Sequence, residues 1–381
     1  MPERGGDTTD MSTIKILHAA DLHLDSPFEA LPAGKAAIRR QEQRALLAAL
    51  ADLAAEEQVD LVLLSGDLLD SANTYYETGD ELVRSLQNIT APVFIAPGNH
   101  DYYSAKSPYA RLQLPENVHI FTESSVRFVS LPSLGARVYG AAFTEDHSGP
   151  LLHGFHAERK EGVLNILCMH GEVGVRGSAY NPISEEDLAQ SGMDYVALGH
   201  IHKASGLLKA GSVWYSWPGC PEGRGFDETG EKTVSIVELS PVDCRLRTAV
   251  ISSHRYEVMK VDVTGADPLL AIHTQLPDDT VRDVYRIILT GETDDTPDLR
   301  RLYGNLSEMF FELQLRDETR LRRSVWESAG EDTLRGLFLT RLKARYDAAR
   351  EEEDKIRIEQ AARWGLAAMD NAEEVVRHED P

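Results

Sequence analysis

The chain contains little cysteine, and its few cysteines follow no pairing pattern. Only Cys168, Cys220 and Cys244 occur among its 381 residues, and no two of them form a Cys-x-x-Cys pair. This odd number of thiols argues against a disulfide framework, and a reducing cytoplasm fits it best. Cys168 lies inside an apolar run, residues 165–169, where we interpret it as a small buried hydrophobic residue.

The chain also lacks a long apolar run. No stretch reaches the roughly 18 apolar residues that a transmembrane helix needs, so we expect no membrane span. The first ten residues are polar and acidic and lack the apolar core of a signal peptide. Residues 1–12 are therefore predicted to form a flexible tail, and Met11 stays open as an alternative start.

Basic residues are scarce relative to acidic ones. The chain has 39 Lys and Arg against 62 Asp and Glu, which gives a net charge of −23. A protein that binds nucleic acid through its whole surface is usually basic, so this balance weighs against that mode. An enzyme that handles phosphate needs positive charge only locally, and two bound divalent cations would supply it.

The apolar pattern of the first 250 residues or so predicts a parallel-rich α/β layer. Residues 14–18, 59–64 and 93–96 read as strands, separated by a helix over 36–57 and a second helix that a capping box at 74–77 would open. A second capping box occurs at 184–187. Further strands are expected at 126–129, 136–139, 163–167, 195–198, 213–215, 233–239 and 246–251, which completes one mixed domain over 13–252.

The remaining residues predict two smaller parts. Strands at 256–263, 284–289 and 310–315 alternate with helices at 268–275 and 297–306, which indicates a small α+β unit over 253–325. The segment 326–381 reads as charged helix with an acidic, frayed end after Met369. Its apolar face either packs on its own domain or docks a partner's helices, and we favour the partner. The face comprises Leu334, Leu337, Phe338, Leu342, Tyr346, Ile356, Ile358 and Trp364.

Five short polar motifs follow the predicted strands in a fixed order. Alone, each is weak, because a His-x-His pair is usually a surface feature and Gly-Asp is a common turn. Ligands gather outside the carboxyl ends of strands in open α/β sheets, so we expect the motifs to converge at one edge of a sheet. The motifs are Asp21-Leu22-His23, Gly66-Asp67, Gly98-Asn99-His100-Asp101, His170-Gly171 and Gly199-His200-Ile201-His202.

The residue types in these motifs point to metal-assisted chemistry on a phosphate ester. Nitrogen and oxygen ligands suit manganese, iron or zinc, and the absence of thiolates disfavours a structural zinc site. Two metals about 3.5–4 Å apart can clamp a phosphate and activate a water as the nucleophile. Asp67, alone after its strand, is the natural bridging carboxylate. His100 and Asp101 are the predicted catalytic residues, and His100, with Asp101 beside it, could contact the scissile phosphate or protonate the leaving oxygen.

Residues 14–202 match the pattern of calcineurin-like metallophosphoesterases, D-x-H…G-D…G-N-H-[DE]…H…G-H-x-H. Within that superfamily the chain resembles the SbcD-like DNA repair nucleases, most closely their YhaO-type branch. Segments 18–28, 66–70 and 217–228 carry this resemblance, together with the small domain after the core. The resemblance implies a four-layer αββα core, a cap domain over the active site and a C-terminal helical segment.

The resemblance also implies roles for the motif residues. One metal would be held by Asp21, His23, Asp67 and His202, and the other by Asp67, Asn99, His170 and His200; His100 would act on the phosphate. Members are manganese-dependent DNA nucleases that commonly form homodimers, and many work with an SbcC-like coiled-coil ATPase. SbcD proper usually has Trp-His-Leu-Gly after its first Asp, whereas this chain has Leu22-His23-Leu24-Asp25, so its DNA specificity is not carried over.

Several alternatives stay open. The same chemistry would serve a phosphoesterase for a nucleotide, a lipid precursor or a phosphoprotein, and a non-catalytic DNA-end scaffold is a third possibility. Arg224 could meet a phosphate or brace a turn. For the basic cluster and the aromatic pair we favour surface or packing roles over contact with DNA, and the loop histidines are assigned to a surface loop. These are the basic cluster Arg316, Arg320, Arg322 and Arg323, the aromatic pair Tyr102 and Tyr103, and the loop residues His147, His153 and His156.

Overall fold

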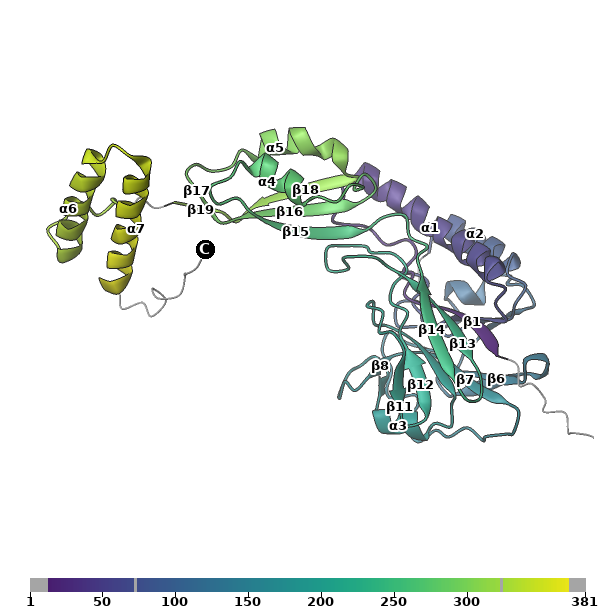
Figure 1. The fold of residues 1–381 in the computed structure, drawn as a ribbon. Helices are drawn as coiled ribbons and strands as arrows, with labels where there is room; N and C mark the ends of the chain where they lie inside the picture. The colour runs from purple at the N-terminus through teal and green to yellow at the C-terminus, as the bar shows by residue number, and fades with distance from the viewer. Residues whose placement is uncertain (1–12, 72–73, 323–324, 370–381) are drawn as a thin grey trace, which may run out of the picture. The chain divides into compact units, whose positions relative to one another are not determined.

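The computed structural model of the protein describes residues 13–71, 74–322 and 325–369 (Figure 1). The tail predicted over residues 1–12, the end of the chain past Met369 and Arg323 of the basic cluster lie outside the described residues. The chain divides into two compact units. The first extends to Met259 and also includes Leu276–Ile287 and Tyr303–Leu315; the second holds Lys260–Gln275, Ile288–Leu302 and the described chain from Arg316.

The first unit contains two six-stranded sheets (Figure 1). In the first sheet, β1 to β4 run parallel, and β13 joins β1 in the antiparallel sense. The predicted strands of this sheet are all present, whereas β4 was not predicted, because its three residues are only partly buried and His119 interrupts the apolar pattern. The order is β14 (Cys244–Ala249), β13 (Val234–Leu239), β1 (Ile14–Ala19), β2 (Leu61–Leu64), β3 (Val93–Ile95) and β4 (Val118–Ile120).

The second sheet has a parallel centre and antiparallel edges. Strands β6, β7, β10 and β12 run parallel, with β5 and β11 at the margins. A short pair, β8 (Glu172–Val173) and β9 (Pro182–Ile183), lies beyond the sheet. The order is β11 (Leu208–Ala210), β12 (Val213–Ser216), β10 (Tyr195–Gly199), β7 (Leu164–His170), β6 (Ala136–Gly140) and β5 (Arg127–Leu131).

The two sheets pack face to face between helices, which confirms the four-layer αββα expectation. One cluster of buried residues joins Ile16 and Leu63 of the first sheet to Ile166 and Ala197 of the second. The fully buried Cys168 belongs to this cluster, as its apolar surroundings predicted. The opposite face of the second sheet is covered more thinly, by α3 (Glu185–Gln190) and neighbouring loops.

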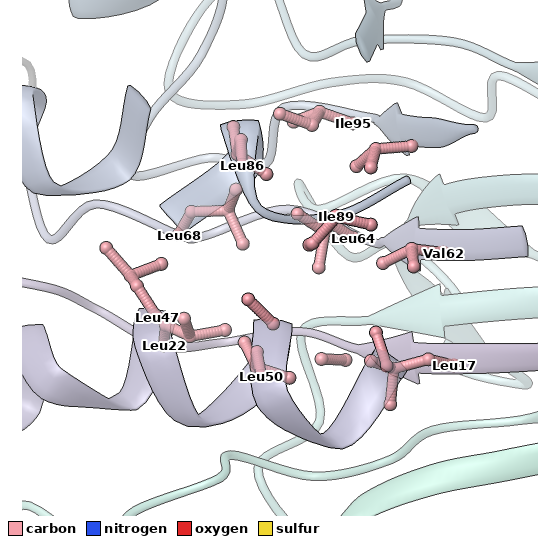
Figure 2. Packing of buried hydrophobic residues seen from close by; sticks show 14 of the residues in the cluster. Leu17, Leu22, Leu47, Leu50, Val62, Leu64, Leu68, Leu86, Ile89 and Ile95 are labelled. Carbon is pink, nitrogen blue, oxygen red and sulfur yellow. The ribbon is translucent and has the colours of Figure 1, made fainter. Parts of the chain in front are cut away.

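Helices α1 (Ala33–Glu56) and α2 (Tyr76–Gln87) cover the outer face of the first sheet. Figure 2 shows Leu47 and Leu50 of α1 in one buried cluster with Leu17 of β1 and Leu64 of β2. Successive side chains of a strand point to opposite faces, so β2 buries Leu63 between the sheets and Leu64 under the helices. Burial on both faces explains why β2 is a near-continuous apolar run in the sequence.

The two predicted capping boxes have different outcomes. Ser184 accepts a hydrogen bond from the backbone N–H of Asp187 and caps α3, as predicted. The box at Thr74 is wrong, because α2 has no side-chain cap from its own segment and the Thr74 hydroxyl donates to the carbonyl of Ser71. Instead the Asp25 carboxylate accepts from the backbone N–H of Tyr75 (3.0 Å) and the hydroxyl of Thr78 (2.6 Å).

The predicted elements after residue 252 are present. A three-stranded sheet has the order β15 (Tyr256–Asp262), β16 (Val284–Thr290) and β18 (Glu312–Asp317). The accompanying helices are α4 (Pro268–Gln275) and α5 (Leu299–Leu306), and β17 (Glu292–Thr293) pairs with β19 (Arg320–Leu321). Arg322 forms an ion pair with Asp294. Within the described residues there are also three 3-10 turns, η1 (Pro108–Ala110), η2 (Pro132–Leu134) and η3 (Ser307–Met309).

Helices α6 (Leu334–Ala348) and α7 (Glu352–Met369) pack against each other. Leu339 and Ala362 are buried in their contact, with Phe338 and Leu342 of the predicted face beside them. Other members of that face are exposed, namely Leu334 (75%), Leu337 (58%), Ile356 (52%) and Trp364 (61%). Among the described helices, none combines the length and apolarity that crossing a bilayer requires.

Candidate metal centre

The polar motifs meet where strands of both sheets end. Strands β1, β2 and β3 of the first sheet and β7 and β10 of the second lead into them. The expectation that one sheet would supply all the motifs is therefore wrong, since His170 and the His200–His202 pair come from the second sheet. His170 is the last residue of β7, and its Nε2 lies 3.3 Å from Asp67 Oδ2 across the two sheets.

Four of the predicted ligands have left-handed backbone conformations. The φ angles are +55° at Asp21, +43° at His23, +51° at Asp67 and +95° at His200. Such conformations cost about 1–3 kcal/mol for residues other than glycine and persist only where the surroundings enforce them. Here the backbone N–H of Asp21 donates to the carbonyl of Gly66 (3.0 Å) and that of His23 to the carbonyl of Asp67 (2.9 Å). These bonds tie the loops after β1 and β2 together.

Two glycines allow the loops to approach closely. A Cβ at Gly98 would lie 2.3 Å from Asp67 Oδ1, and one at Gly199 would lie 1.9 Å from the carbonyl oxygen of Ser65. Both distances are far below any possible contact. The glycines of the Gly-Asn-His-Asp and Gly-His-x-His motifs are therefore needed for packing around the centre rather than for backbone freedom.

We define the first ligand group as Asp21, His23 and His202 together with Asp67. The ligand atoms of Asp21, His23 and His202 all lie within 4.8 Å of one another. His23 Nε2 is 3.1 Å from His202 Nε2 and 3.8 Å from Asp67 Oδ2. A buried and a partly buried imidazole nitrogen that face each other beside carboxylates form a donor set suited to a divalent cation.

The second ligand group comprises Asp67, Asn99, His170 and His200. The atoms of Asp67, His170 and His200 lie within 4.8 Å of one another. Asn99 Oδ1 is 3.1 Å from His170 Nε2 and 3.2 Å from His200 Nδ1. Asp67 Oδ2 borders both groups, which is the placement that a bridging carboxylate needs. The seven predicted ligands therefore come together as two overlapping groups, and their donors fit two divalent ions.

Burial strongly perturbs the ionisation of these groups. It raises the pKa of Asp21 to about 7 and lowers the pKa of His23 to about 4. Burial alone would lower the pKa of His170, but the Asp67 carboxylate outweighs it and raises that pKa to about 9. A metal ion would favour the charged carboxylates and neutral imidazoles that binding requires.

Each of the four histidines has its second ring nitrogen held by an oxygen. We call these oxygens the outer acceptors. They are Asp70 Oδ1 for His23 (3.0 Å), Glu228 Oε1 for His202 (2.6 Å), Glu172 Oε1 for His200 (2.7 Å) and the Ser65 carbonyl for His170 (2.9 Å). Such partners orient an imidazole and select its tautomer. The sequence predicted no role for the three carboxylates, although each lies in or beside a motif segment, because only the folded loops show which imidazole each side chain reaches.

Arg224 braces the outer acceptors instead of facing open solvent. Its Nη2 lies 2.8 Å from Glu228 Oε1, and its Nη1 lies 3.4 Å from Asp70 Oδ1. This supports the bracing alternative for Arg224. His202, Cys220 and Glu228 also cluster, but the Arg224 cation occupies this neighbourhood and burial raises the pKa of the Cys220 thiol to about 12. A third metal site there is therefore disfavoured.

His100 and Asp101 have different surroundings although they are adjacent. The His100 side chain is 44% exposed, its Nδ1 lies 3.1 Å from the carbonyl of Asp70, and its ring is 4.7 Å from the His23 ring. Asp101 is buried, and its carboxylate accepts hydrogen bonds from four backbone N–H groups and one hydroxyl. The donors are Asp67, Leu68, Leu69 and Gly98, with the hydroxyl of Tyr109. His100 is thus available to a substrate, whereas Asp101 is enclosed.

The surroundings of the centre include aromatic residues and a cavity. The half-exposed Tyr180 ring lies 5.0 Å from the His200 ring, and the sequence reasoning did not single it out. Tyr103 packs against the core, which is the favoured alternative for it. A cavity of about 730 Å³ adjoins Asp70, Arg224 and Glu228. The three loop histidines, His147, His153 and His156, are exposed as predicted.

Comparisons with known proteins agree with this arrangement. The family model of calcineurin-like phosphoesterases matches residues 14–204. The chain is 30% identical over 335 residues to YhaO of Bacillus subtilis, named as an uncharacterized metallophosphoesterase, and the match covers 83% of this chain and 81% of that protein. The DNA double-strand break repair protein Mre11 of Saccharolobus solfataricus is 26% identical, with 73% and 76% covered. SbcD, a component of the nuclease SbcCD of Bacillus subtilis, is 24% identical, with 60% and 67% covered.

Proposed function

Because the chain belongs to the calcineurin-like phosphoesterase family, we propose that its two ligand groups hold two divalent metal ions and that the site hydrolyses phosphodiester bonds in DNA. Membership of the family makes the chain a metal-dependent phosphoesterase. The observation that carries the proposal is the convergence of seven nitrogen and oxygen donors into two groups that share Asp67.

Each ligand group would hold one metal ion, and Asp67 would belong to both groups. When bound, two divalent ions supply Lewis-acid stabilisation of phosphate charge and generate a nucleophile at neutral pH. The mixed imidazole, carboxylate and amide donors suit manganese. Positive charge would then be confined to the centre, which reconciles phosphate binding with a chain of net charge −23.

His100 is the residue that we assign to the phosphate itself. Its ring nitrogen lies within 4.8 Å of ligand atoms of His23 and Asp67, but its side chain is partly exposed and the seven other donors already form two groups, so we assign it to the substrate and not to a metal. Contact between Nδ1 and the Asp70 carbonyl orients the ring and leaves Nε2 for the substrate. From there it can contact a phosphate oxygen or protonate the leaving oxygen. Asp101, predicted as catalytic, is better assigned to positioning, because its oxygens are occupied by the loops that carry Asp67 and Asn99.

Two features favour DNA over a smaller phosphate ester. The relatives include a component of the nuclease SbcCD and a DNA double-strand break repair protein. The cavity of about 730 Å³ beside the centre is larger than a phosphate group needs, and its lining includes Arg286 and the ring of Phe226. The exposed apolar residues of α6 and α7 support a helical partner, for which we propose an SbcC-like coiled-coil ATPase. We also propose that the protein is cytoplasmic and forms a homodimer.

The test is cleavage of linear and single-stranded DNA by the purified chain in Mn²⁺, alone and with its ATPase. We expect cleavage that a chelator abolishes and that His100→Ala suppresses. Absence of cleavage of every DNA substrate under both conditions would overturn the proposal. A small phosphodiester such as bis-p-nitrophenyl phosphate serves as the comparison. Turnover of it that far exceeds DNA cleavage would favour the small-substrate alternative, and cleavage by the isolated chain would exclude a mere scaffold.

A further inference from the structure

The two ligand groups have separate outer supports. His200 and His202 are two residues apart on one loop, yet their outer acceptors come from different segments. Glu172, at the start of β8, holds His200 Nε2 at 2.7 Å. Glu228, in the loop between β12 and β13, holds His202 Nδ1 at 2.6 Å. Neighbouring histidines that belong to different ligand groups are thus supported independently.

Arg224 joins the supports of the first group into one chain of charges. Its guanidinium contacts Glu228, which holds His202, and Asp70, which holds His23. The side chains of Asp70, Arg224 and Glu228 are 24%, 21% and 7% exposed, so water competes little for Glu228. Both histidines of the first group therefore depend on the chain Asp70–Arg224–Glu228, which we call the charge chain.

The loop that carries the charge chain is anchored to the core. Glu222, six residues before Glu228, forms an ion pair with Arg39 of α1 at 2.7 Å, and both side chains are essentially fully buried. The backbone N–H and Nη2 of Arg224 both contact the Glu228 carboxylate at 2.8 Å, which closes a compact turn. Because its own contacts fix this loop, Glu228 can determine the position of the His202 ring.

We propose that Glu228 and Arg224 are positioning residues that set the affinity of the metal held by the first ligand group, and that Glu172 does the same for the metal of the second group. This inference rests on the two-metal site of the proposed function. A carboxylate that accepts the second imidazole N–H fixes the tautomer and raises the basicity of the ligand nitrogen, and its loss typically weakens metal binding by about 10- to 100-fold. Because the supports are separate, the two affinities can be changed one at a time.

The experiment is a Mn²⁺ titration of the metal-free full-length chain, followed by calorimetry and by electron paramagnetic resonance. The wild type is expected to bind two ions and to give a spin-coupled spectrum. Glu228→Gln and Glu172→Gln are matched changes, since each replaces one carboxylate with an amide of the same size. Each should weaken one ion by about 10- to 100-fold and give an uncoupled spectrum when only the tighter site is filled. Glu231→Gln, an exposed carboxylate in the same segment as Glu228, should change nothing.

Ligand deletions identify which ion is affected. His202→Ala leaves the second group, and in that background Glu172→Gln should weaken the remaining ion whereas Glu228→Gln should not. His170→Ala leaves only the first group intact, and in that background Glu228→Gln should weaken the remaining ion whereas Glu172→Gln should not. Arg224→Lys keeps the charge but cannot contact Glu228 and Asp70 together, so it should weaken the same ion as Glu228→Gln. It also serves as the second variant if Glu228→Gln does not fold.

The outcomes separate this inference from the proposed function. Fewer than two Mn²⁺ bound by the wild type would overturn the two-metal function itself. Two ions bound by the wild type, with unchanged affinities in Glu228→Gln and Arg224→Lys, would overturn the positioning role alone. Equal weakening of the remaining ion by Glu228→Gln in both deletion backgrounds would overturn the separation of the two supports.

Discussion

Replacement of Asp101 by Asn tests whether this residue braces the centre or transfers protons. Its Oδ1 accepts from the backbone N–H groups of Gly98 (2.7 Å) and Asp67 (3.2 Å). Its Oδ2 accepts from the backbone N–H groups of Leu68 (2.7 Å) and Leu69 (3.3 Å) and from the hydroxyl of Tyr109 (2.5 Å). No group in this set can accept a hydrogen bond from an amide NH₂ without breaking an existing contact.

The magnitude follows from the number of donors that lose their acceptor. If the amide oxygen of Asn takes the position of Oδ2, the NH₂ faces the N–H groups of Gly98 and Asp67, and both bonds are lost. A hydrogen bond to a charged acceptor contributes about 1.5–3 kcal/mol, so the change should destabilise these loops by about 3–6 kcal/mol. That is a large share of the roughly 5–15 kcal/mol that stabilises a typical domain.

Hydrogen exchange measured by mass spectrometry on peptides that cover residues 60–72 and 92–104 reports this change locally. Loss of about 3–6 kcal/mol should accelerate exchange in both peptides by about 10²- to 10⁴-fold. Tyr109→Phe removes one donor and leaves the carboxylate, so it should accelerate exchange by only about 10- to 100-fold. Wild-type exchange in Asp101→Asn, combined with lost cleavage, would refute the bracing role and restore a role for Asp101 in proton transfer.

Three further predictions address the ligands, the chemistry and the core. Asp67→Asn should weaken both Mn²⁺ ions together in calorimetry, because Oδ2 lies 3.3 Å from His170 Nε2 and 3.8 Å from His23 Nε2; two unchanged affinities would exclude a bridge. His100→Ala should leave both affinities intact and lower kcat for DNA cleavage by about 10²- to 10⁴-fold, and a wild-type kcat would remove His100 from the mechanism. Leu50→Ala should lower the free energy of unfolding by about 2–5 kcal/mol in urea denaturation, and an unchanged midpoint would contradict the packing in Figure 2.

Local patterns in the sequence were enough to predict the main elements of the first unit and the residues that converge on the centre. Strand β2 is buried on both faces, so its residues form an apolar run that is visible without knowledge of its neighbours. Asp67 lies three residues after the end of such a run and is therefore placed at the strand end. The ligands were predictable because each follows a strand that can be recognised from its own apolar run.

Features that depend on distant residues could not be predicted in the same way. The cap of α2 comes from Asp25, fifty residues before Tyr75, whereas the local Thr74 pattern indicated a capping box that does not form. Glu172 follows the His170-Gly171 motif and Glu228 ends the segment 217–228, but each acquires its role only when its loop folds against a histidine. Strand β4 has only three residues, and pairing with β3 rather than its own pattern makes it a strand.

The left-handed backbone at Asp21, His23, Asp67 and His200 makes these four ligands poor choices for folding alone. Glycine would relieve the strain at each position, by about 1–3 kcal/mol, and would delete a ligand in the same step. A single codon change of this kind could therefore produce a more stable but inert protein. Selection for a well-folded product and selection for chemistry oppose each other at these sites, so a library screened only for thermostability should enrich inactive variants here.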